Sequence, residues 1–272
     1  MNTPTRPLIP EMQIQQFLND GYCVVDDLFD AEEIAEIESF FEDYKKIGQK
    51  VYDGGRSYEE IDPSKAQLRA MHPHRYSKRA EGWLLNQNVA SVLEVLLGKP
   101  PLAVQSMYYF KPPGARGQGM HQDNFYLLAA PATCIAAWTA IDAAELENGC
   151  LYVVPSSNKK GIYCPEKEIT DPWFSYGDTH INPFPREMKP IPVTVPKGST
   201  MFFGGQLVHG SGPNRTSDTS RRTFIGHYIS EASKQVASFY HPVLSMDGEV
   251  VTTLKKPAGG GPCGDGWLGA TH

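Results

Sequence analysis

The stretch TCIAAWTAIDAAELENGCLYVV (133–154) decides the fold, because it sets two short β-prone runs on either side of Asn148-Gly149. The runs TCIAAWTAI and CLYVV are bounded by turn residues and are rich in residues that favour strands. An Asn-Gly pair between two such runs is a strong signal for a hairpin turn. We therefore predict two strands that a hairpin joins.

The same strand-like pattern continues on both sides of this stretch. Further short β-prone runs are LAVQSMYYF (102–110), IPVTV (191–195), STMFF (199–203) and RRTFIGHYI (221–229). The 25 glycines and 22 prolines of the 272 residues also favour a turn-rich β protein over a helical bundle.

The first hundred residues carry helical patterns instead. The stretch AEEIAEIESFFEDYKKIG (31–48) has apolar residues on one helical face, and Asp30 with Glu33 has the form of a capping box. A second helix is predicted over GWLLNQNVASVLEVLL (82–97), ending at Gly98 and packed outside the barrel. The residues of the first apolar face are Ile34, Ile37, Phe40, Phe41 and Tyr44.

Helices followed by a run of strands argue against a doubly wound α/β sheet, in which the two alternate. We predict a mainly β protein with flanking α-helices, folded as a double-sheet barrel. Residues 1–272 are expected to form one domain, with a helical part over about 1–100, a barrel core over about 101–240 and an irregular C-terminal tail.

Composition and charge exclude several classes of protein. The net charge is −6, so no global positive field exists to hold nucleic acid. About 18 consecutive apolar residues would be needed to span a bilayer, and the sequence offers no such run. The five cysteines are odd in number and form no C-x-x-C, so we expect no disulfide framework and a reducing, cytoplasmic compartment.

Residues 45–79 contain nine Lys or Arg against four acids. This segment is either a solvated loop or a rim that attracts anions to a pocket.

The segment GMHQDNFYL holds the first candidate metal ligands, His121 and Asp123. On a strand, residues i and i+2 face the same side, so both can reach one ion, while Gln122 points away or toward a neighbour. About one H-x-[DE] is expected by chance at this composition, so the pair alone means little. His209, at the end of another predicted strand, supplies a third ligand, and two histidines with one carboxylate are typical of non-haem Fe(II) oxygenases.

An arginine pair follows the third ligand. Arg221 and Arg222 begin a strand that we expect to pair with the one carrying His209, and only one of the two can face inward. We favour Arg221, with Arg222 as the competitor. A guanidinium suits a dicarboxylate, and Ser211 can add a hydroxyl, so the implied cosubstrate is 2-oxoglutarate.

At this point the sequence resembles the phytanoyl-CoA dioxygenase family of Fe(II)/2-oxoglutarate oxygenases. The likeness rests on HQD at 121–123, on WTAIDAAELENGCLYVVPSS from Trp138 and on VHGSGPNRTSDTSRR, and it covers about residues 15–230. It implies a double-stranded β-helix, a cupin-like jelly roll. It also implies an Fe(II) ion on His121, Asp123 and His209, with Arg221 and Ser211 on 2-oxoglutarate. Further candidate cofactor-binding residues are Trp138, Gln105, Met107 and Gln122.

The predicted activity is a dioxygenase that uses O2 and 2-oxoglutarate to oxidise, and most simply hydroxylate, a C–H bond of a small metabolite or acyl-CoA. Alternatives with the same cofactors are desaturation, epimerisation or rearrangement in natural-product biosynthesis. Two rival classes are a cupin enzyme that does not use 2-oxoglutarate and a non-catalytic jelly-roll binding module. We expect a small-molecule substrate, no nucleic-acid or membrane partner, and a monomer or homodimer.

Overall fold

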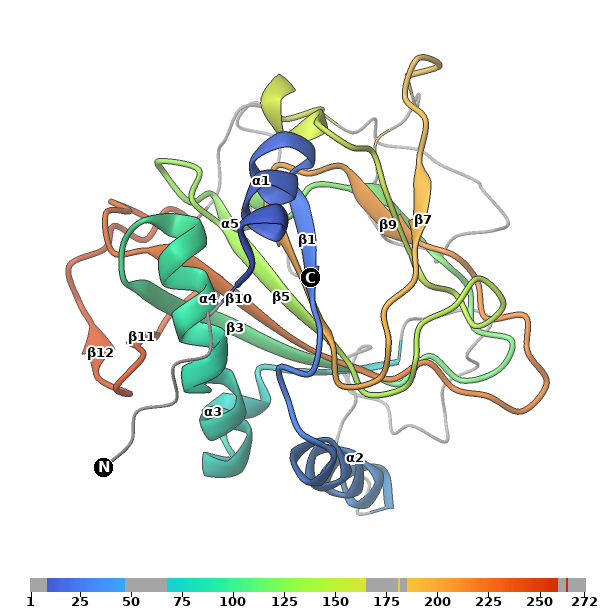
Figure 1. Ribbon diagram of the computed structural model, residues 1–272. Coiled ribbons are helices and arrows are strands. Elements are labelled where there is room, and N and C mark those ends of the chain that lie inside the picture. The colour runs from blue at the N-terminus through green and yellow to red at the C-terminus, as the bar shows by residue number, and fades with distance from the viewer. Residues whose placement is uncertain (1–8, 47–67, 165–180, 182–184, 259–262, 264–272) are drawn as a thin grey trace.

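Two antiparallel sheets face each other in the computed structural model, which describes residues 9–46, 68–164, 181, 185–258 and 263 (Figure 1). The larger sheet has the strand order β1-β8-β5-β10-β3-β11-β12, with β2 also paired to β3, and the smaller has the order β4-β9-β6-β7. The larger sheet consists of β1 (Tyr22–Val25), β2 (Arg69–Met71), β3 (Pro101–Tyr109), β5 (Ile135–Ala140), β8 (Thr200–Gly204), β10 (Thr223–Ser230), β11 (Val243–Ser245) and β12 (Val250–Val251). The smaller consists of β4 (Gln118–His121), β6 (Leu151–Val153), β7 (Ile191–Val193) and β9 (His209–Ser211). This is the predicted double-stranded β-helix.

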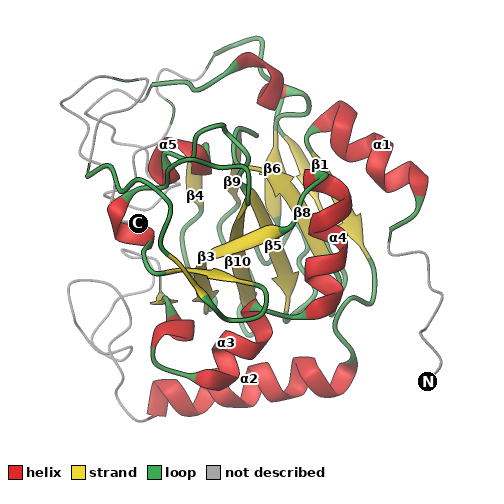
Figure 2. Ribbon diagram, turned by 90° about the vertical axis from the view of Figure 1, so that its left-hand side faces the viewer, coloured by secondary structure: helices red, strands yellow, loops and turns green. Residues whose placement is uncertain are grey.

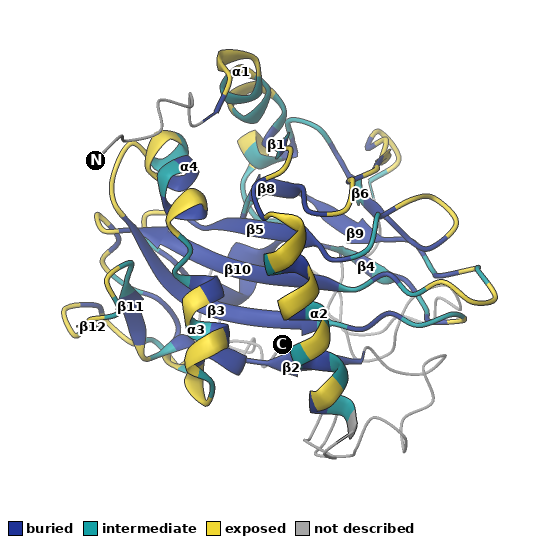
Figure 3. Cartoon of the chain, turned by 60° about the horizontal axis from the view of Figure 1, so that its bottom comes forward, coloured by how far each residue is buried: buried dark blue, intermediate teal, exposed yellow. Residues whose placement is uncertain are grey.

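Helices cover the outer face of the larger sheet, as Figures 2 and 3 show. Phe41 stacks on Tyr108 of β3 with the ring centroids 3.9 Å apart, so the predicted apolar face is buried against the sheet. None of the described helices is long and apolar enough to cross a bilayer. The helices are α1 (Glu11–Asp20), α2 (Ala31–Lys46), α3 (Lys78–Leu84), α4 (Gln87–Leu97) and α5 (Asp123–Leu127), with short 3-10 turns at Pro73–Arg75, Ser157–Lys160 and Ser238–Tyr240.

The predicted capping box is confirmed at the start of α2. The Asp30 carboxylate accepts hydrogen bonds from the backbone N–H groups of Glu32 and Glu33, and the Glu33 carboxylate accepts one from the N–H of Asp30. The prediction of one helix over 82–97 is wrong, because two helices cover this run. Asn86 separates them, since its side chain accepts hydrogen bonds from the first N–H groups of α4.

Two strands, β1 and β2, lie within the part predicted to be helical, and both join the larger sheet. The strand β2 also falls inside the segment 45–79 predicted as a loop, and its Arg69 is buried. Most of that segment, including Lys50, Arg56 and Lys65, lies outside the described residues.

The predicted hairpin at Asn148-Gly149 is wrong. Strand β5 belongs to the larger sheet and β6 to the smaller, so the chain between them crosses from one sheet to the other. The Asn148 side chain closes this crossing, since it accepts from the N–H of Glu145 and donates to the carbonyl of Ala143. Gly149 has a φ of 88°, which favours glycine, and a Cβ there would lie 2.4 Å from the carbonyl oxygen of Gly212.

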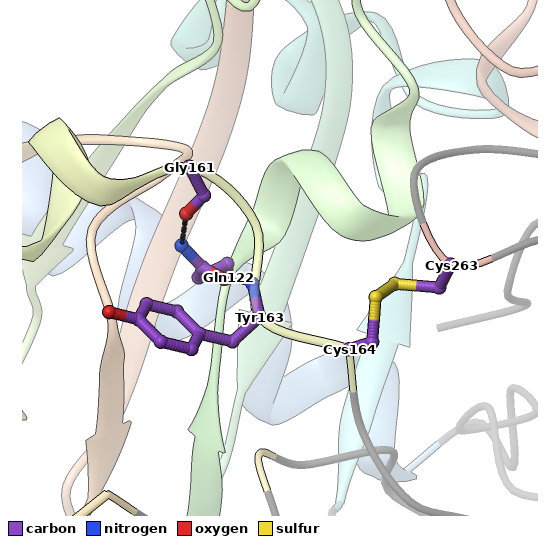
Figure 4. The surroundings of a disulfide bond; sticks show 5 residues. All are labelled: Gln122, Gly161, Tyr163, Cys164 and Cys263. Atoms are coloured by element: carbon purple, nitrogen blue, oxygen red, sulfur yellow. Dashed lines mark hydrogen bonds between the residues drawn. A yellow bond between two sulfur atoms is a disulfide. The ribbon is translucent and has the colours of Figure 1, made fainter.

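The expectation of no disulfide is also wrong. Cys164 and Cys263 form a disulfide, shown in Figure 4, while Cys23, Cys134 and Cys150 are free and buried. Without a C-x-x-C or an even count, sequence spacing gave no sign of a pair 99 residues apart. The cysteines therefore do not indicate a reducing compartment, and a cytoplasmic location remains a prediction.

We expect the disulfide to stabilise the fold. Breaking it with the Cys164→Ala and Cys263→Ala double variant should lower the free energy of unfolding by up to about 4 kcal/mol, because the bond closes a long loop in the unfolded chain. Urea unfolding of both proteins, with and without a dithiol reductant, measures this. The reductant should destabilise the parent and leave the double variant unchanged. Equal unfolding midpoints for all samples would contradict the prediction.

Candidate metal centre

Three buried side chains meet between the two sheets. His121 ends β4, His209 begins β9 and the two residues are paired in register, while Asp123 begins α5. The Nε2 atoms of His121 and His209 lie 3.5 and 3.6 Å from Oδ1 of Asp123. The predicted convergence of His121 and Asp123 occurs although Asp123 lies on a helix, because Gln122 between them has extended backbone angles.

The hydrogen bonds of both histidines prepare them to bind a metal ion. Nδ1 of His121 lies 2.7 Å from the carbonyl oxygen of Gly119, and Nδ1 of His209 lies 3.0 Å from that of Leu207. A carbonyl only accepts, so each Nδ1 carries the proton and each Nε2 offers its lone pair. The Nε2 of His121 accepts a hydrogen bond from the Gln118 amide, which fits this tautomer.

The protonation states fit a cation site. Burial lowers the pKa of His209 to about 4. Burial raises the pKa of Asp123, but the neighbouring His209, His227 and His121 outweigh that effect and hold this pKa well below its ordinary value. At neutral pH His209 is thus a neutral imidazole and Asp123 a carboxylate. Together with the imidazole of His121 they form a donor set that suits a divalent transition metal with positions left open for other ligands. Among the described residues, this is the one group of three with metal-ligand geometry.

His227 of β10 positions the carboxylate. Its Nε2 lies 3.1 Å from Oδ2 of Asp123, so this oxygen is held while Oδ1 faces the two histidines. His227 is thus buried and hydrogen-bonded. Its link to Asp123 was not foreseen, although alternation along β10 places it on the inward face with Ile225.

The cavity that holds the triad also holds two buried cationic side chains, Arg221 and Lys111. The Arg221 Nε donates to the carbonyl oxygen of Gly149 at 3.1 Å, and the guanidinium lies 5.2 Å from the ring centroid of Trp138. The Lys111 Nζ donates to the hydroxyl of Ser211 at 3.0 Å. In the described part of the chain, no carboxylate forms an ion pair with either cation.

Burial controls the pKa values at this end of the cavity. It lowers the pKa of Arg221 to about 10, and it lowers that of Lys111 well below its ordinary value, with repulsion from Arg221 adding to the effect. Two such groups side by side favour an anion, because an anion would offset the cost of burying their charges. The sequence analysis did not identify Lys111 as a site residue, because a lysine before two prolines has the pattern of an ordinary loop residue.

Arg222 lies outside the cavity. Its guanidinium bonds to both carboxylate oxygens of Asp142 and forms ion pairs with Glu38 and Glu42 of α2. The expected pairing of its strand with the strand of His209 is wrong, since β10 pairs with β3 and β5 while β9 pairs with β4 and β6. The turn between them crosses from the smaller sheet to the larger.

The other candidate cofactor-binding residues separate into two groups. Met107, Trp138 and Ser211 line the cavity, whereas Gln105 and Gln122 do not. Gln122 instead holds the segment that leads to the disulfide (Figure 4): its amide nitrogen donates to the carbonyls of Gly161 and Gln206, and its oxygen accepts from the N–H of Tyr163.

Sheet architecture and site together define a jelly-roll protein with a buried centre of two histidines and one carboxylate. The family model of "Phytanoyl-CoA dioxygenase (PhyH)" matches residues 17–223. The chain belongs to the phytanoyl-CoA dioxygenase family.

Known proteins resemble this chain in sequence and in fold. "Phytanoyl-CoA dioxygenase 1" of Oryza sativa subsp. japonica is 36% identical over 153 residues, which are 54% of this chain and 53% of that protein. The match thus spans about half the length of this curated relative. The epimerase SnoN from nogalamycin biosynthesis, which is dependent on alpha ketoglutarate, has a TM-score of 0.68 at 20% identity and covers 93% of this chain and 96% of its own. EctD from S. alaskensis, solved with 2-oxoglutarate and 5-hydroxyectoine, has a TM-score of 0.63 at 18% identity, with coverage of 84% and 79%.

Proposed function

We propose that this protein is a dioxygenase that uses Fe(II), 2-oxoglutarate and O2 to oxidise a small organic molecule. One observation carries the proposal: a single cavity holds the triad of His121, Asp123 and His209 together with Arg221 and Lys111, two buried basic side chains that no described carboxylate pairs with. The names of the family and of its relatives support the same reaction class.

His121, Asp123 and His209 would hold the ferrous ion through Nε2, Oδ1 and Nε2. With 2-oxoglutarate and O2 bound, the metal supplies the oxidising chemistry, and the cosubstrate is converted to succinate and CO2. The triad leaves positions open for both, whereas a structural zinc site would use a fourth protein ligand.

Each protein group has a defined task in this account. The carbonyls of Gly119 and Leu207 hold the two imidazoles in the ligating tautomer, and His227 fixes the Asp123 carboxylate. Arg221 would grip the carboxylate of 2-oxoglutarate that lies farther from the metal. The apolar side chains of Met107 and Ile225 keep that part of the cavity dry, which strengthens these electrostatic contacts.

The substrate is a small molecule in this proposal. The fold is compatible with hydroxylation and also with other oxidative outcomes, since a shared fold does not fix the reaction. Assay of succinate formation against a panel of metabolites and acyl-CoA thioesters tests the proposal. Succinate that depends on Fe(II) and O2 supports it. Failure to convert 2-oxoglutarate while another substrate consumes O2 would favour the cupin alternative, and no O2 uptake with any substrate would favour a binding module.

Lys111 gives a prediction about the cosubstrate. Replacing Lys111 by Met should raise the KM for 2-oxoglutarate roughly 10- to 100-fold, because a hydrogen bond to a charged group contributes about 1.5–3 kcal/mol. Steady-state succinate assays measure this. The Lys197→Met variant is the control, since Lys197 lies at the surface and pairs with Glu38, and its KM should not change. An unchanged KM in Lys111→Met would exclude the residue from cosubstrate binding.

A further inference from the structure

Several buried polar atoms beside the metal centre have no hydrogen-bond partner among the described residues. The side chains are His72, Gln105, His227 and Tyr240, of which none is more than 5% exposed. The atoms are both ring nitrogens of His72, both amide atoms of Gln105, Nδ1 of His227 and the hydroxyl of Tyr240. Each such group costs free energy unless something satisfies it, so a cluster of them indicates a ligand or ordered water.

The cluster adjoins the proposed iron site through His227. Gln105 is the cross-strand partner of His227, whose other ring nitrogen holds Asp123. The backbone N–H of His72 donates to the carbonyl of Ser106, the residue after Gln105, at 2.8 Å. The His72 ring centroid lies 6.3 Å from that of Tyr240. These contacts link the four residues in one region of the fold.

The backbone of His72 is strained as well. Its φ of 50° and ψ of 45° lie in the left-handed region, which a residue other than glycine adopts at a cost. The next residue is Pro73, and the strained turn directs the His72 ring toward Phe239, whose ring centroid is 5.0 Å away. Strained backbone of this kind clusters at binding and active sites, and no described group bonds to the His72 ring nitrogens.

None of the four side chains in the cluster is a carboxylate, a lysine or an arginine. Burial lowers the pKa of His72 to about 2, with smaller contributions from Arg75, His74 and His227, so this ring is neutral at physiological pH. The Arg75 guanidinium is directed to the carbonyl of Phe239. The neutral His72 imidazole, the Gln105 amide and the Tyr240 phenol each donate and accept, which matches an uncharged partner that does both.

We propose that His72, Gln105, His227 and Tyr240 form a subsite for an uncharged hydroxyl or amide group of the substrate. This inference deepens the proposed function and rests on it, since it places that group next to the oxidising centre. It gives Gln105 a role toward the substrate in place of the role toward 2-oxoglutarate that the family resemblance implied.

Two small probes of similar shape test whether the subsite binds an uncharged group or an anion. Acetamide is uncharged and both donates and accepts, whereas acetate is an anion. Saturation-transfer NMR and crystal soaks on the full chain, with and without Fe(II) and 2-oxoglutarate under anaerobic conditions, should show acetamide at Gln105 and His72 and no acetate there. His72→Asn, which tolerates the left-handed backbone but has a shorter side chain, should weaken acetamide binding at least tenfold.

The two buried glutamines Gln105 and Gln122 allow the subsite to be tested through the thermal stability of variants. Gln122→Met removes an amide that makes three hydrogen bonds and should lower Tm by roughly 5 °C or more, since each lost bond costs stability. Gln105→Met removes an amide that has no hydrogen-bond partner among the described residues, and it should leave Tm unchanged or higher. It should also weaken acetamide binding at least tenfold.

The outcomes separate this inference from the proposed function. Acetamide bound in the cluster of a protein that fails to convert 2-oxoglutarate would uphold the subsite and refute the activity. Ordered water alone in the cluster, preferred binding of acetate, or a large loss of Tm in Gln105→Met would overturn the subsite and leave the assignment of the iron ligands intact.

Discussion

Replacing Asp123 by Ala should abolish ferrous-iron binding and reduce succinate formation on the order of a thousandfold or more. The carboxylate is the one anionic ligand of the triad, and metal stabilisation contributes several kcal/mol, each 1.36 kcal/mol being a factor of ten in rate. The variant also leaves His227 without its hydrogen-bond acceptor. Iron content after anaerobic loading and gel filtration, together with a succinate assay, measures both effects.

Asp142→Ala is the matched control for that variant. Asp142 is a partly buried carboxylate that bonds to Arg222 outside the cavity. It should lose stability and keep iron binding. One ferrous ion per chain and parental succinate rates in Asp123→Ala would show that the triad is not the metal site.

The second large effect is expected at Arg221. Arg221→Leu should weaken 2-oxoglutarate binding roughly 100-fold or more, because truncating one partner of a buried charge pair costs about 2–5 kcal/mol. The folded protein should keep its stability, since the buried guanidinium has no carboxylate partner among the described residues when 2-oxoglutarate is absent. Isothermal titration of the anaerobic Fe(II) protein with 2-oxoglutarate gives the dissociation constant.

Arg222→Leu should behave in the opposite way. It breaks the ion pairs with Asp142, Glu38 and Glu42 and should lower Tm, while the affinity for 2-oxoglutarate stays within a few-fold of the parent. A large loss of affinity in Arg222→Leu with none in Arg221→Leu would reverse the assignment of the two neighbours.

The sequence predicted the strands, their general architecture and the residues of the triad, because each depends on local pattern. Alternation along 102–110 and 221–229 places Met107 and Ile225 inward, and the H-x-D spacing brings His121 and Asp123 together. The local sequence pattern of Asp30 and Glu33 also predicted the capping box of α2 correctly.

Features that depend on the pairing of distant segments were not predictable in this way. The Asn148-Gly149 turn has the local form of a hairpin, but in a jelly roll the chain crosses there between sheets. The disulfide of Cys164 with Cys263 joins segments that only the fold brings together. Lys111 becomes notable only when the structure shows that it is buried in the cavity. His72 and His74 form a close pair in the sequence that reads as part of a loop, and the structure shows that both are buried.

An anaerobic crystal structure of the full chain with Fe(II) and 2-oxoglutarate tests the central claim most directly. We predict one iron ion bound by Nε2 of His121, Oδ1 of Asp123 and Nε2 of His209, with a carboxylate of 2-oxoglutarate against the Arg221 guanidinium. Iron bound at other residues, or 2-oxoglutarate bound away from Arg221, would contradict the account.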